Sequence, residues 1–500
     1  MKNSPDIFYL IHSLTPNEKG YFKKFCSRSG SRDSLKYLEL FDLIGAQPTY
    51  DEEKLKNRIG DKRLLKNLSA EKNYLYNQIL DSLALSGSSS GPREEVLNLL
   101  SSARVLFLKS LYPLVSESLE KIYKLCMEGC FYELLLEALS MELSVWQYLT
   151  AENRRELKNI FFDRDEIVQK IKLEDEAHQL NLQVLWSFTS TGVGRTSDVL
   201  QQREQWLARA NALVAREKKD PCVRTRVYNL NTIIFLYNTL DQMENTRTSL
   251  RELITILEEQ PILREDFMNL YASSLSNLIL VSFYAENIKE GEKEIEKLRN
   301  LKSSSLRSQL AIFVSRMNAE FEYFKRKHDF DGACKLAEEM KIDLIRLESL
   351  IPFHYFVHMV YFAFRAYFYT GQYREALFWI NYLTNSGKEI TREEAASITR
   401  ISEIILHYEM GHMELVTSLT QSAQRFLEKK NTLYGFEKHM LDFFREFSTR
   451  NGEREAFTEL KKKLEPLLKD DLEGRVKAYF DFEAWVESKI TGQKMTELIK

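Results

Sequence analysis

The chain has 500 residues, of which 44% are hydrophobic and 29% are charged, and its formal net charge is −3. This length exceeds what one compact core supports, so several domains or an extended repeat array are expected. The balanced charge argues against a nucleic-acid-binding protein, which would carry a strongly basic surface.

The rest of the composition predicts a helical protein of a reducing compartment. Glycine (18) and proline (9) are scarce, since average usage predicts about 35 and 25 for this length and β hairpins need both. The five cysteines are scattered and odd in number, which does not match a disulfide framework. No apolar stretch approaches the roughly 20 residues that span a bilayer, and no signal peptide is evident. A soluble, cytoplasmic protein is therefore expected.

The sequence of residues 1–85 predicts four or five short helices, which would form a cap or docking domain. The motif TPNE at residues 15–18 matches a capping box with proline at the first helical position. A second helix ends before Pro48, a third follows Asp51, and a fourth carries the apolar stripe of residues 68–83.

A basic run in the same segment leaves its role open. Residues 1–85 hold 14 Lys/Arg and 11 Asp/Glu, a difference of +3. Capped short helices with basic residues fit a helix-turn-helix DNA-binding segment, but such modules usually carry a denser basic patch. The solvated face of a helical cap is therefore favoured. The basic residues are Lys54, Lys56, Arg58, Lys62, Arg63 and Lys66.

Residues 86–92, SGSSSGP, form the one obvious linker, a flexible Ser/Gly tract that ends in a helix-starting proline. The linker separates the N-terminal segment from the remainder of the chain. We divide that remainder into a repeat region at 93–469 and a terminal capping helix and tail at 470–500.

The region after the linker repeats a pattern of two helices joined by a tight turn. In the clearest unit, 363–383, an aromatic pair ends the first helix, Gly371 permits the reversal, and the small Ala376 lets the second helix approach closely. Aligning the small residue gives positions 246, 291, 333, 376, 416 and 456, with spacings of 45, 42, 43, 40 and 40. Weaker copies fit Val115, Leu157 and Val199, so about nine antiparallel helix pairs are expected.

These units resemble the tetratricopeptide repeat, in which an aromatic residue follows the turn glycine by two positions and a small residue follows three later. Gly371, Tyr373 and Ala376 match that pattern fully, whereas His328 replaces the glycine and Thr246 the small residue in other units. The mean spacing of about 42 exceeds the 34 of that family, so longer helices are expected. The resemblance covers roughly residues 95–465. It implies an all-α, right-handed superhelical solenoid with a concave inner wall.

No catalytic or metal-binding constellation emerges from the sequence. His354 and His358 have the spacing of two ligands on one helix face, but HYFVH lacks the glutamate of HExxH, which favours packing or groove-lining histidines. Cys126 and Cys130 lack two further zinc ligands, which favours buried thiols. The glycines of residues 190–198, STGVGRTSD, do not match a phosphate-binding loop and predict a turn. We expect no metal, no cofactor and no enzymatic activity.

The repeat pattern places polar and aromatic residues of the first helices on the expected concave wall. Asparagine amides both donate to and accept from an extended peptide backbone, while aromatic and arginine side chains supply anchors. The alternative is that the asparagines only satisfy neighbouring helices. The predicted partner-binding residues are Tyr228, Asn231, Asn238, Asn277, Phe283, Asn318, Glu322, His358, Tyr361, Arg365 and Phe368.

The sequence therefore favours a non-catalytic scaffold or adaptor that binds a protein or peptide ligand. The alternative is a peptide-responsive transcriptional regulator, in which residues 1–85 bind DNA and the solenoid senses a ligand. Salt-dependent DNA affinity of the N-terminal segment would separate these two hypotheses. An enzyme ranks last, and a deep polar pocket with perturbed carboxylates would favour it.

Overall fold

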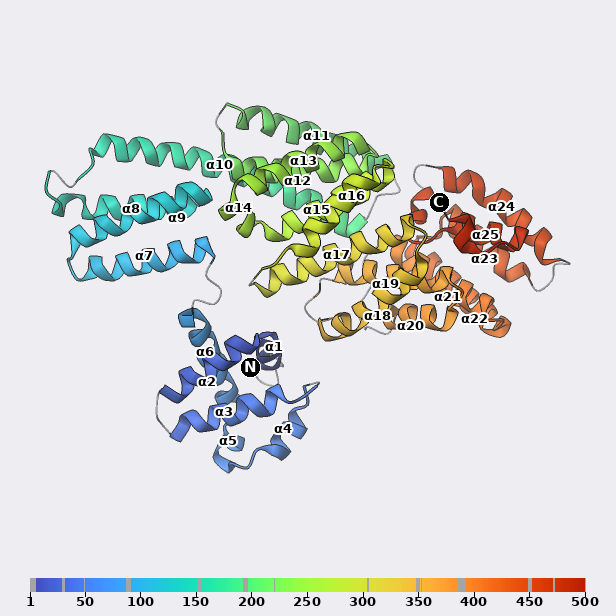
Figure 1. Cartoon of the computed structure of the whole chain (residues 1–500), viewed down its shortest axis with the longest axis horizontal. Coiled ribbons are helices and arrows are strands. Elements are labelled where there is room, and N and C mark those ends of the chain that lie inside the picture. Colours follow the sequence, from blue (N-terminus) through green and yellow to red (C-terminus); the bar gives the residue numbers. More distant parts are fainter. Residues whose placement is uncertain are drawn as a thin grey trace. The chain divides into compact units, whose positions relative to one another are not determined.

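A computed structural model of the chain describes residues 6–28, 32–48, 50–86, 91–151, 154–191, 197–219, 221–303, 305–347, 351, 353–384, 393–447, 452–470 and 473–499. Every regular element in these ranges is a helix, which confirms the all-α prediction (Figure 1). The helices up to residue 150 are α1 (Asp6–Ser13), α2 (Pro16–Arg28), α3 (Arg32–Gly45), α4 (Glu52–Arg58), α5 (Lys62–Lys66), α6 (Leu68–Ser86), α7 (Pro92–Leu108), α8 (Tyr112–Gly129), α9 (Tyr132–Val145) and the short 3-10 helix η1 (Trp146–Tyr148). The later helices are α10 (Leu157–Thr191), α11 (Ser197–Glu217), α12 (Val223–Thr239), α13 (Met243–Glu259), α14 (Pro261–Asp266), α15 (Met268–Tyr284), α16 (Ile288–Asn300), α17 (Leu306–Arg326), α18 (Phe330–Leu347), α19 (Phe353–Tyr369), α20 (Tyr373–Thr384), α21 (Glu393–Glu409), α22 (Met413–Lys430), α23 (Gly435–Glu446), α24 (Glu453–Lys469), the 3-10 helix η3 (Glu473–Ala478), α25 (Phe482–Thr491) and α26 (Met495–Leu498).

Contacts divide the chain into two compact units. The first comprises residues 1–129 with 303–309, and the second comprises residues 130–302 with 310–500. Residues 87–90 of the predicted linker lie outside the described ranges. All the partner-binding residues predicted above lie in the second unit.

Helices α1 to α6 share a hydrophobic core of their own. Its centre includes Ile11, Phe22 and Ile79, whose side chains are fully buried. The predicted capping box opens α2. The Thr15 backbone N–H donates to Glu18 Oε2 (2.7 Å), and the Glu18 N–H donates to Thr15 Oγ1 (3.3 Å). Two helix-end donors that would otherwise lack partners are thereby satisfied.

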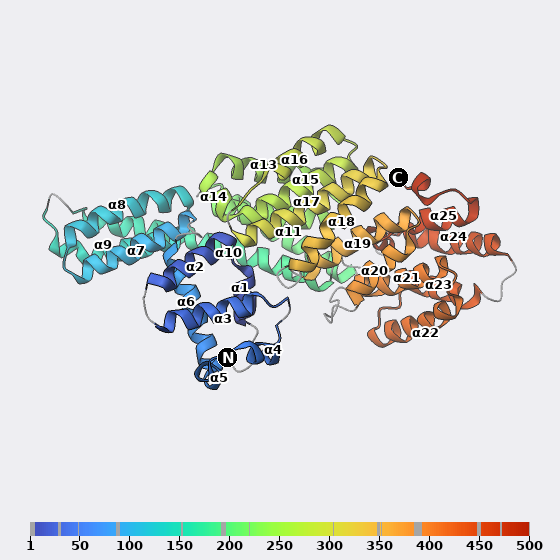
Figure 2. The same ribbon diagram turned by 60° about the horizontal axis from the view of Figure 1, so that its bottom comes forward.

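Six consecutive helix pairs follow residue 222 in the described part of the chain. The first helices are α12, α15, α17, α19, α21 and α23, and the second helices are α13, α16, α18, α20, α22 and α24. The two helices of a pair pack together, as α19 and α20 do (Figure 2). Each second helix begins three residues before the small residue aligned in the sequence, at Met243, Ile288, Phe330, Tyr373, Met413 and Glu453. The handedness of a superhelix and membership of the tetratricopeptide family stay predictions.

Between residues 157 and 191 the structure differs from the regular pairing that we expected. The weaker sequence copies at Leu157 and Val199 predicted separate helix pairs, but α10 is one helix of 35 residues. Its sequence contains neither glycine nor proline, so nothing in it interrupts the helical hydrogen bonds. Helix α10 packs against both α9 and α12 and so takes part in two successive pairs.

A residue with left-handed backbone conformation recurs at the turn inside these pairs. Gly371 (φ +75°) and Gly411 (φ +76°) hold this position in two pairs, which explains why the sequence places glycine there. In three other pairs the position is taken by Asp241 (φ +56°), Glu286 (φ +58°) or His328 (φ +53°). A residue with a Cβ atom is destabilised by about 1–2 kcal/mol in this conformation.

Replacing Glu286 by glycine is therefore expected to stabilise the protein by up to about 1 kcal/mol. The left-handed strain of about 1–2 kcal/mol exceeds the extra entropy that glycine loses on folding, about 0.5–1 kcal/mol. The Glu286 side chain is exposed, so little packing is lost. The measurement is the unfolding midpoint in differential scanning calorimetry. The matched control is Ala285→Gly, because Ala285 has φ −84° and should show only the entropic loss. Equal shifts of the two variants would contradict the backbone argument.

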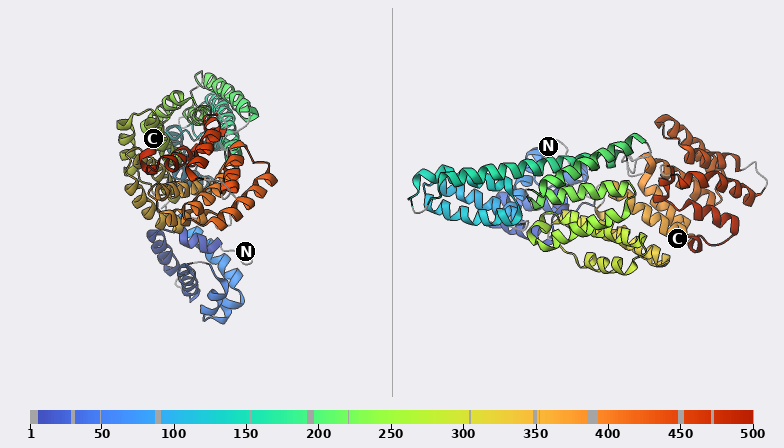
Figure 3. Two further views of the ribbon diagram at one scale, coloured as in Figure 1. Left: turned by 90° about the vertical axis from the view of Figure 1, so that its right-hand side faces the viewer. Right: turned by 90° about the horizontal axis from the view of Figure 1, so that it is seen from above.

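After α24 the chain turns back onto the preceding helix pairs. We call residues 473–499 the C-terminal segment. A continuous helix was expected over residues 470–490, but Gly474 lies in a tight turn where a Cβ atom would come within 2.5 Å of the Leu468 carbonyl oxygen. The segment instead runs through η3, a non-helical stretch at 479–481, and α25. Its apolar side chains join the same core as those of α19 to α24. In the left view of Figure 3 the segment, in dark red, lies among the helices of the last pairs.

Candidate functional site

The predicted residues on α12 contact α10. The Tyr228 ring stacks on His178 with 4.5 Å between centroids, and Asn231 Nδ2 donates to Asn181 Oδ1 at 3.4 Å. Asn231 is buried, and its amide hydrogen-bonds the neighbouring helix α10, as the alternative interpretation of the asparagines expects. Asn238 on α12 and Asn277 on α15 are exposed.

Two predicted residues of α19 lie under the C-terminal segment. Tyr361 is 3% exposed, its ring centroid is 5.2 Å from that of Tyr479, and its hydroxyl is 2.7 Å from Thr399 Oγ1. Phe368 is 2% exposed, and its ring meets Phe480 edge-on at 4.9 Å. The face that the repeat pattern predicted as open is filled here by the chain itself.

The remaining predicted residues divide between buried and partly buried positions. Phe283 is 1% exposed and packs over Gly291. Asn318 on α17 is partly buried, and its Oδ1 atom accepts no hydrogen bond from the described part of the chain. His358 is partly buried on α19.

The structure brings Glu322 and Arg365 together in a group of charged and phenolic side chains. We call this group the inner polar cluster; its members come from α15, α17, α19 and the C-terminal segment. Lys325 Nζ lies 3.4 Å from Asp481 Oδ1, the Tyr369 hydroxyl donates to Asp481, and Arg326 Nε lies 3.4 Å from Glu322 Oε1. Three cations thus face two carboxylates. The members are Tyr284, Glu322, Lys325, Arg326, Arg365, Tyr369 and Asp481.

Among the three cations of the inner polar cluster, Arg365 is the one that makes no ion pair with a described residue. Its guanidinium lies 4.7 Å from the ring centroid of Phe362, which in turn stacks on Phe321 at 5.4 Å. Burial opposes its charge, but the neighbouring Tyr369, Asp481 and Glu322 outweigh that effect and raise the pKa of Arg365. No described residue accepts a hydrogen bond from its five N–H groups. It borders a cavity of about 20 Å³, which is room for one water molecule.

Burial, reinforced by the Asp481 carboxylate, raises the pKa of the Tyr369 phenol well above its usual value. Tyr369 is therefore a neutral hydrogen-bond donor at physiological pH. Together with Lys325 it holds Asp481, which stands directly before α25. The charges of the cluster consequently fix where the C-terminal segment enters the inner face.

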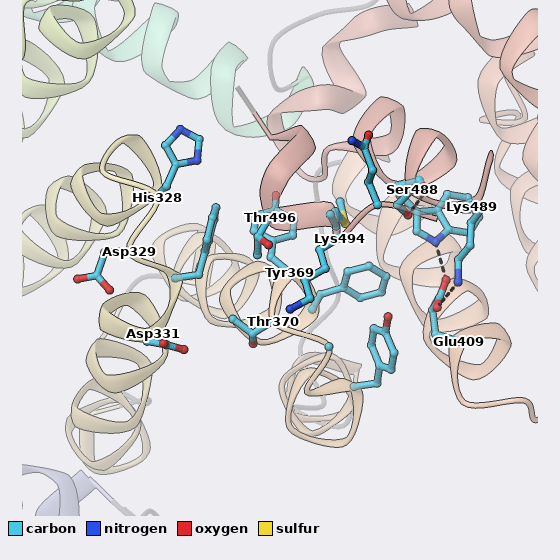
Figure 4. Close-up of a pocket in the computed structure, with 17 residues that line it drawn as sticks. His328, Asp329, Asp331, Tyr369, Thr370, Glu409, Ser488, Lys489, Lys494 and Thr496 are labelled. Atoms are coloured by element: carbon cyan, nitrogen blue, oxygen red, sulfur yellow. Dashed lines mark hydrogen bonds and ion pairs between the residues drawn. The ribbon is translucent and has the colours of Figure 1, made fainter. Parts of the chain in front are cut away.

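A cleft of about 680 Å³ adjoins the inner polar cluster, and Tyr369 lines both. One wall is formed by the turns of two helix pairs, and the other by α25 and the residues that follow it. In Figure 4, His328, Asp329 and Asp331 lie at one end, Glu409 and Lys489 lie at the other, and Thr370, Lys494 and Thr496 lie between them.

At one end of the cleft, the carboxylate of Glu409 already has hydrogen-bond donors from the chain itself. Glu409 accepts hydrogen bonds from Trp485 Nε1 (2.8 Å) and Lys489 Nζ (2.5 Å). Burial, with the Glu409 carboxylate as a second cause, raises the pKa of the Tyr373 phenol. Lys494, by contrast, is exposed and makes no ion pair with a described residue. The cleft thus combines short polar side chains, the exposed Lys494 and aromatic side chains in its walls.

Sequence reasoning missed most members of the cluster and the cleft. Lys325 and Arg326 follow the predicted Glu322 by only three and four residues, so they share its end of α17. A helical projection with a wider arc would have included them. The C-terminal residues carry no local signal, because they reach the inner face only through a turn after α24.

Among the described residues, no group of three or more His, Cys, Asp and Glu side chains is placed to hold a metal ion. Cys126 and Cys130 are buried, and burial raises the pKa of Cys126 to about 12. The side chain of His354 and residues 192–196 lie outside the described part of the structure.

Part of the basic run in the N-terminal segment is neutralised by acidic neighbours. Lys54 pairs with Asp51 (3.1 Å), and Lys56 pairs with Glu53 (3.0 Å) and Glu52 (3.4 Å). These contacts reduce the positive charge available to a nucleic-acid backbone.

No family model, no curated protein and no solved structure matches the chain. Of the helices described, none combines the length and apolar character needed to cross a membrane.

Proposed function

We propose that the chain is a non-catalytic, tetratricopeptide-like scaffold that binds a segment of a partner polypeptide at the inner polar cluster and the adjoining cleft. The observation that carries this proposal is Arg365. Its guanidinium lies against the ring of Phe362 and borders the cavity of about 20 Å³, which shares Phe330 and Tyr369 with the 680 Å³ cleft. Its N–H groups have no hydrogen-bond acceptor among the described residues.

The chemistry of the cleft supports a polypeptide ligand. An extended backbone needs donors and acceptors along its length. The Thr496 hydroxyl can do both, and the Ser488 hydroxyl, which donates to the Trp485 carbonyl oxygen (2.6 Å), can still accept. Aromatic and arginine side chains at the centre of a site supply most of the binding energy in protein interfaces. Phe330 and Tyr369 line both the cleft and the small cavity, and Arg365 lines the small cavity beside them.

Site-specific photocrosslinking in the native cell tests this proposal. p-Benzoylphenylalanine placed at Lys494, which lines the cleft, is expected to give a discrete protein adduct. The matched control is the same residue placed at Lys462, an exposed lysine of α24 that lines no part of the cleft. The adduct should weaken in the folded Arg365→Leu variant. Adducts of equal yield at both lysines, or none at Lys494, would refute the proposed site.

The regulator hypothesis receives less support. Two of the basic residues on the described N-terminal helices, Lys54 and Lys56, are paired with acidic residues, which lowers the positive charge that this segment presents. The expected result is that the full chain shows no salt-dependent affinity for duplex DNA. A steep fall of DNA affinity with salt would favour the regulator instead.

A further inference from the structure

The C-terminal segment occupies the inner face of the last helix pairs in the manner of a bound peptide. Tyr479, Phe480 and Phe482 place their rings against two of the first helices, α19 and α23. Tyr479 meets Tyr361 of α19 at 5.2 Å, Phe480 meets Phe364 of α19 at 5.6 Å, and Phe482 meets Phe436 of α23 at 4.7 Å. Side chains that enter separate pockets along one groove are typical of peptide recognition.

Polar contacts fix the direction and position of the segment. At one end, Glu473 accepts hydrogen bonds from the backbone N–H groups of Gly435 (3.0 Å) and Phe436 (3.1 Å) at the start of α23. In the middle, Lys325 and Tyr369 hold Asp481. Farther on, Trp485 Nε1 donates to Glu409 at 2.8 Å. An aromatic–aromatic–acidic–aromatic sequence, Tyr479 to Phe482, thus lies between charged anchors.

The C-terminal segment leaves some hydrogen-bond donors of the inner face without an acceptor from the described residues. Its single central carboxylate is taken by Lys325 and Tyr369, while the N–H groups of Arg365 find no acceptor among the described residues. A ligand with a second acidic side chain would fill these donors as well. An external segment could in that way gain an interaction that the chain's own segment lacks.

We propose that the inner face of α17, α19, α21 and α23 is a recognition site for polypeptide segments in which aromatic side chains flank an acidic one. The C-terminal segment is a built-in ligand of this site and competes with the partner. This inference rests on the proposed scaffold function and names its ligand class. A tethered segment competes at an effective concentration in the millimolar range, so the intact chain binds such partners weakly until its own segment is released.

A fluorescein-labelled peptide with the sequence of residues 477–488, KAYFDFEAWVES, is the probe. The full chain is compared with the double variant Phe480→Ala/Asp481→Ser. Asp481 stands at the N-cap position of α25 without a side-chain capping hydrogen bond, and serine is also a favoured residue at that position. Fluorescence anisotropy is expected to show saturable binding to the double variant, and binding at least about tenfold weaker to the unaltered chain.

Charge reversal locates the peptide on the inner face. In the double-variant background, Lys325→Glu should weaken binding of the probe and strengthen binding of a peptide in which lysine replaces the aspartate. The matched control is Lys463→Glu on α24, where Lys463 pairs with Glu459 at the outer surface, and it should leave both affinities unchanged. Equal effects of the two lysine variants would overturn the proposed position.

Two further outcomes decide the remaining cases. A folded double variant that shows no saturable binding up to about 1 mM probe overturns the proposal. If circular dichroism shows that the double variant is unfolded, hydrogen exchange of the unaltered chain decides instead. Faster exchange at 482–491 than in α23 supports a releasable segment, and equal protection overturns it. A crosslinked adduct at Lys494 together with a failed peptide titration would leave the scaffold function standing and remove only this inference.

Discussion

Gly291→Ala is expected to destabilise the protein by about 1–3 kcal/mol, although alanine is the better helix former. A Cβ atom at residue 291 would lie 2.1 Å from Cε1 of Phe283, far inside any real contact. Phe283 is 1% exposed, so its ring has little room to move away. The gain in helix propensity, about 1 kcal/mol, is smaller than the usual cost of overpacking a core, about 1–3 kcal/mol and occasionally more.

Urea unfolding followed by circular dichroism measures this effect. The matched control is Gly20→Ala in α2, where nothing lies within 4 Å of the added atom. That variant should be stabilised by about 1 kcal/mol. Combining Gly291→Ala with Phe283→Leu should recover part of the loss, because the shorter side chain makes room for the methyl group. Additive effects of the two substitutions would contradict direct contact between residues 283 and 291.

Arg224→Leu is expected to cost about 3–5 kcal/mol, the largest loss that we predict for a single residue. Arg224 is 7% exposed and joins three helices: its Nε donates to Glu174 of α10 (3.1 Å), and its Nη1 donates to Asp266 of α14 (2.6 Å). Its guanidinium also lies 4.8 Å from the ring centroid of Phe267. Removing the cation takes an ion-pair partner from Glu174, which is partly buried, and from Asp266.

The cause of that loss can be separated by two companions, measured by the same urea unfolding. Arg224→Lys keeps the charge but cannot donate to both carboxylates in the same fork, so a smaller loss of about 1.5–3 kcal/mol is expected. The triple variant Arg224→Leu/Glu174→Gln/Asp266→Asn should recover much of the stability, because it also removes the two negative charges that Arg224 balances. A triple variant as unstable as Arg224→Leu would assign the loss to packing and to the contact with Phe267.

The sequence predicted the helix pairs well because their signals are local. A small residue, a turn and an apolar stripe all lie within one unit, and the aligned positions 291 and 376 therefore fall in the first turn of α16 and α20. The capping box at residues 15–18 is equally local, and its two hydrogen bonds are present. The long helix α10 was not predicted, because the spacing of the small residues places each repeat unit but does not show whether the helices of two neighbouring units are continuous.

The candidate site was only partly predictable, since its parts come from distant sequence positions. Glu322 and Arg365 were predicted from the repeat pattern, and both belong to the inner polar cluster. Their surroundings depend on Asp481, which lies 156 positions after its partner Lys325. No periodic pattern connects these residues. A helical projection also gives no sign that another part of the chain covers Tyr361 and Phe368.

The contact between Lys325 and Asp481 also governs the order of events during synthesis. A repeat array ordinarily folds through contacts between neighbours, so each pair can form as it leaves the ribosome. Here the apolar faces of α19, α21 and α23 gain their final covering only from residues 476–486, which follow α19 by more than 100 positions. At about 5–20 residues per second, α19 waits roughly 6–24 s for that covering after its own synthesis. During this interval the nascent chain presents an aromatic surface that a chaperone could shield, and synthesis of residues 476–486 becomes the step that completes this part of the core.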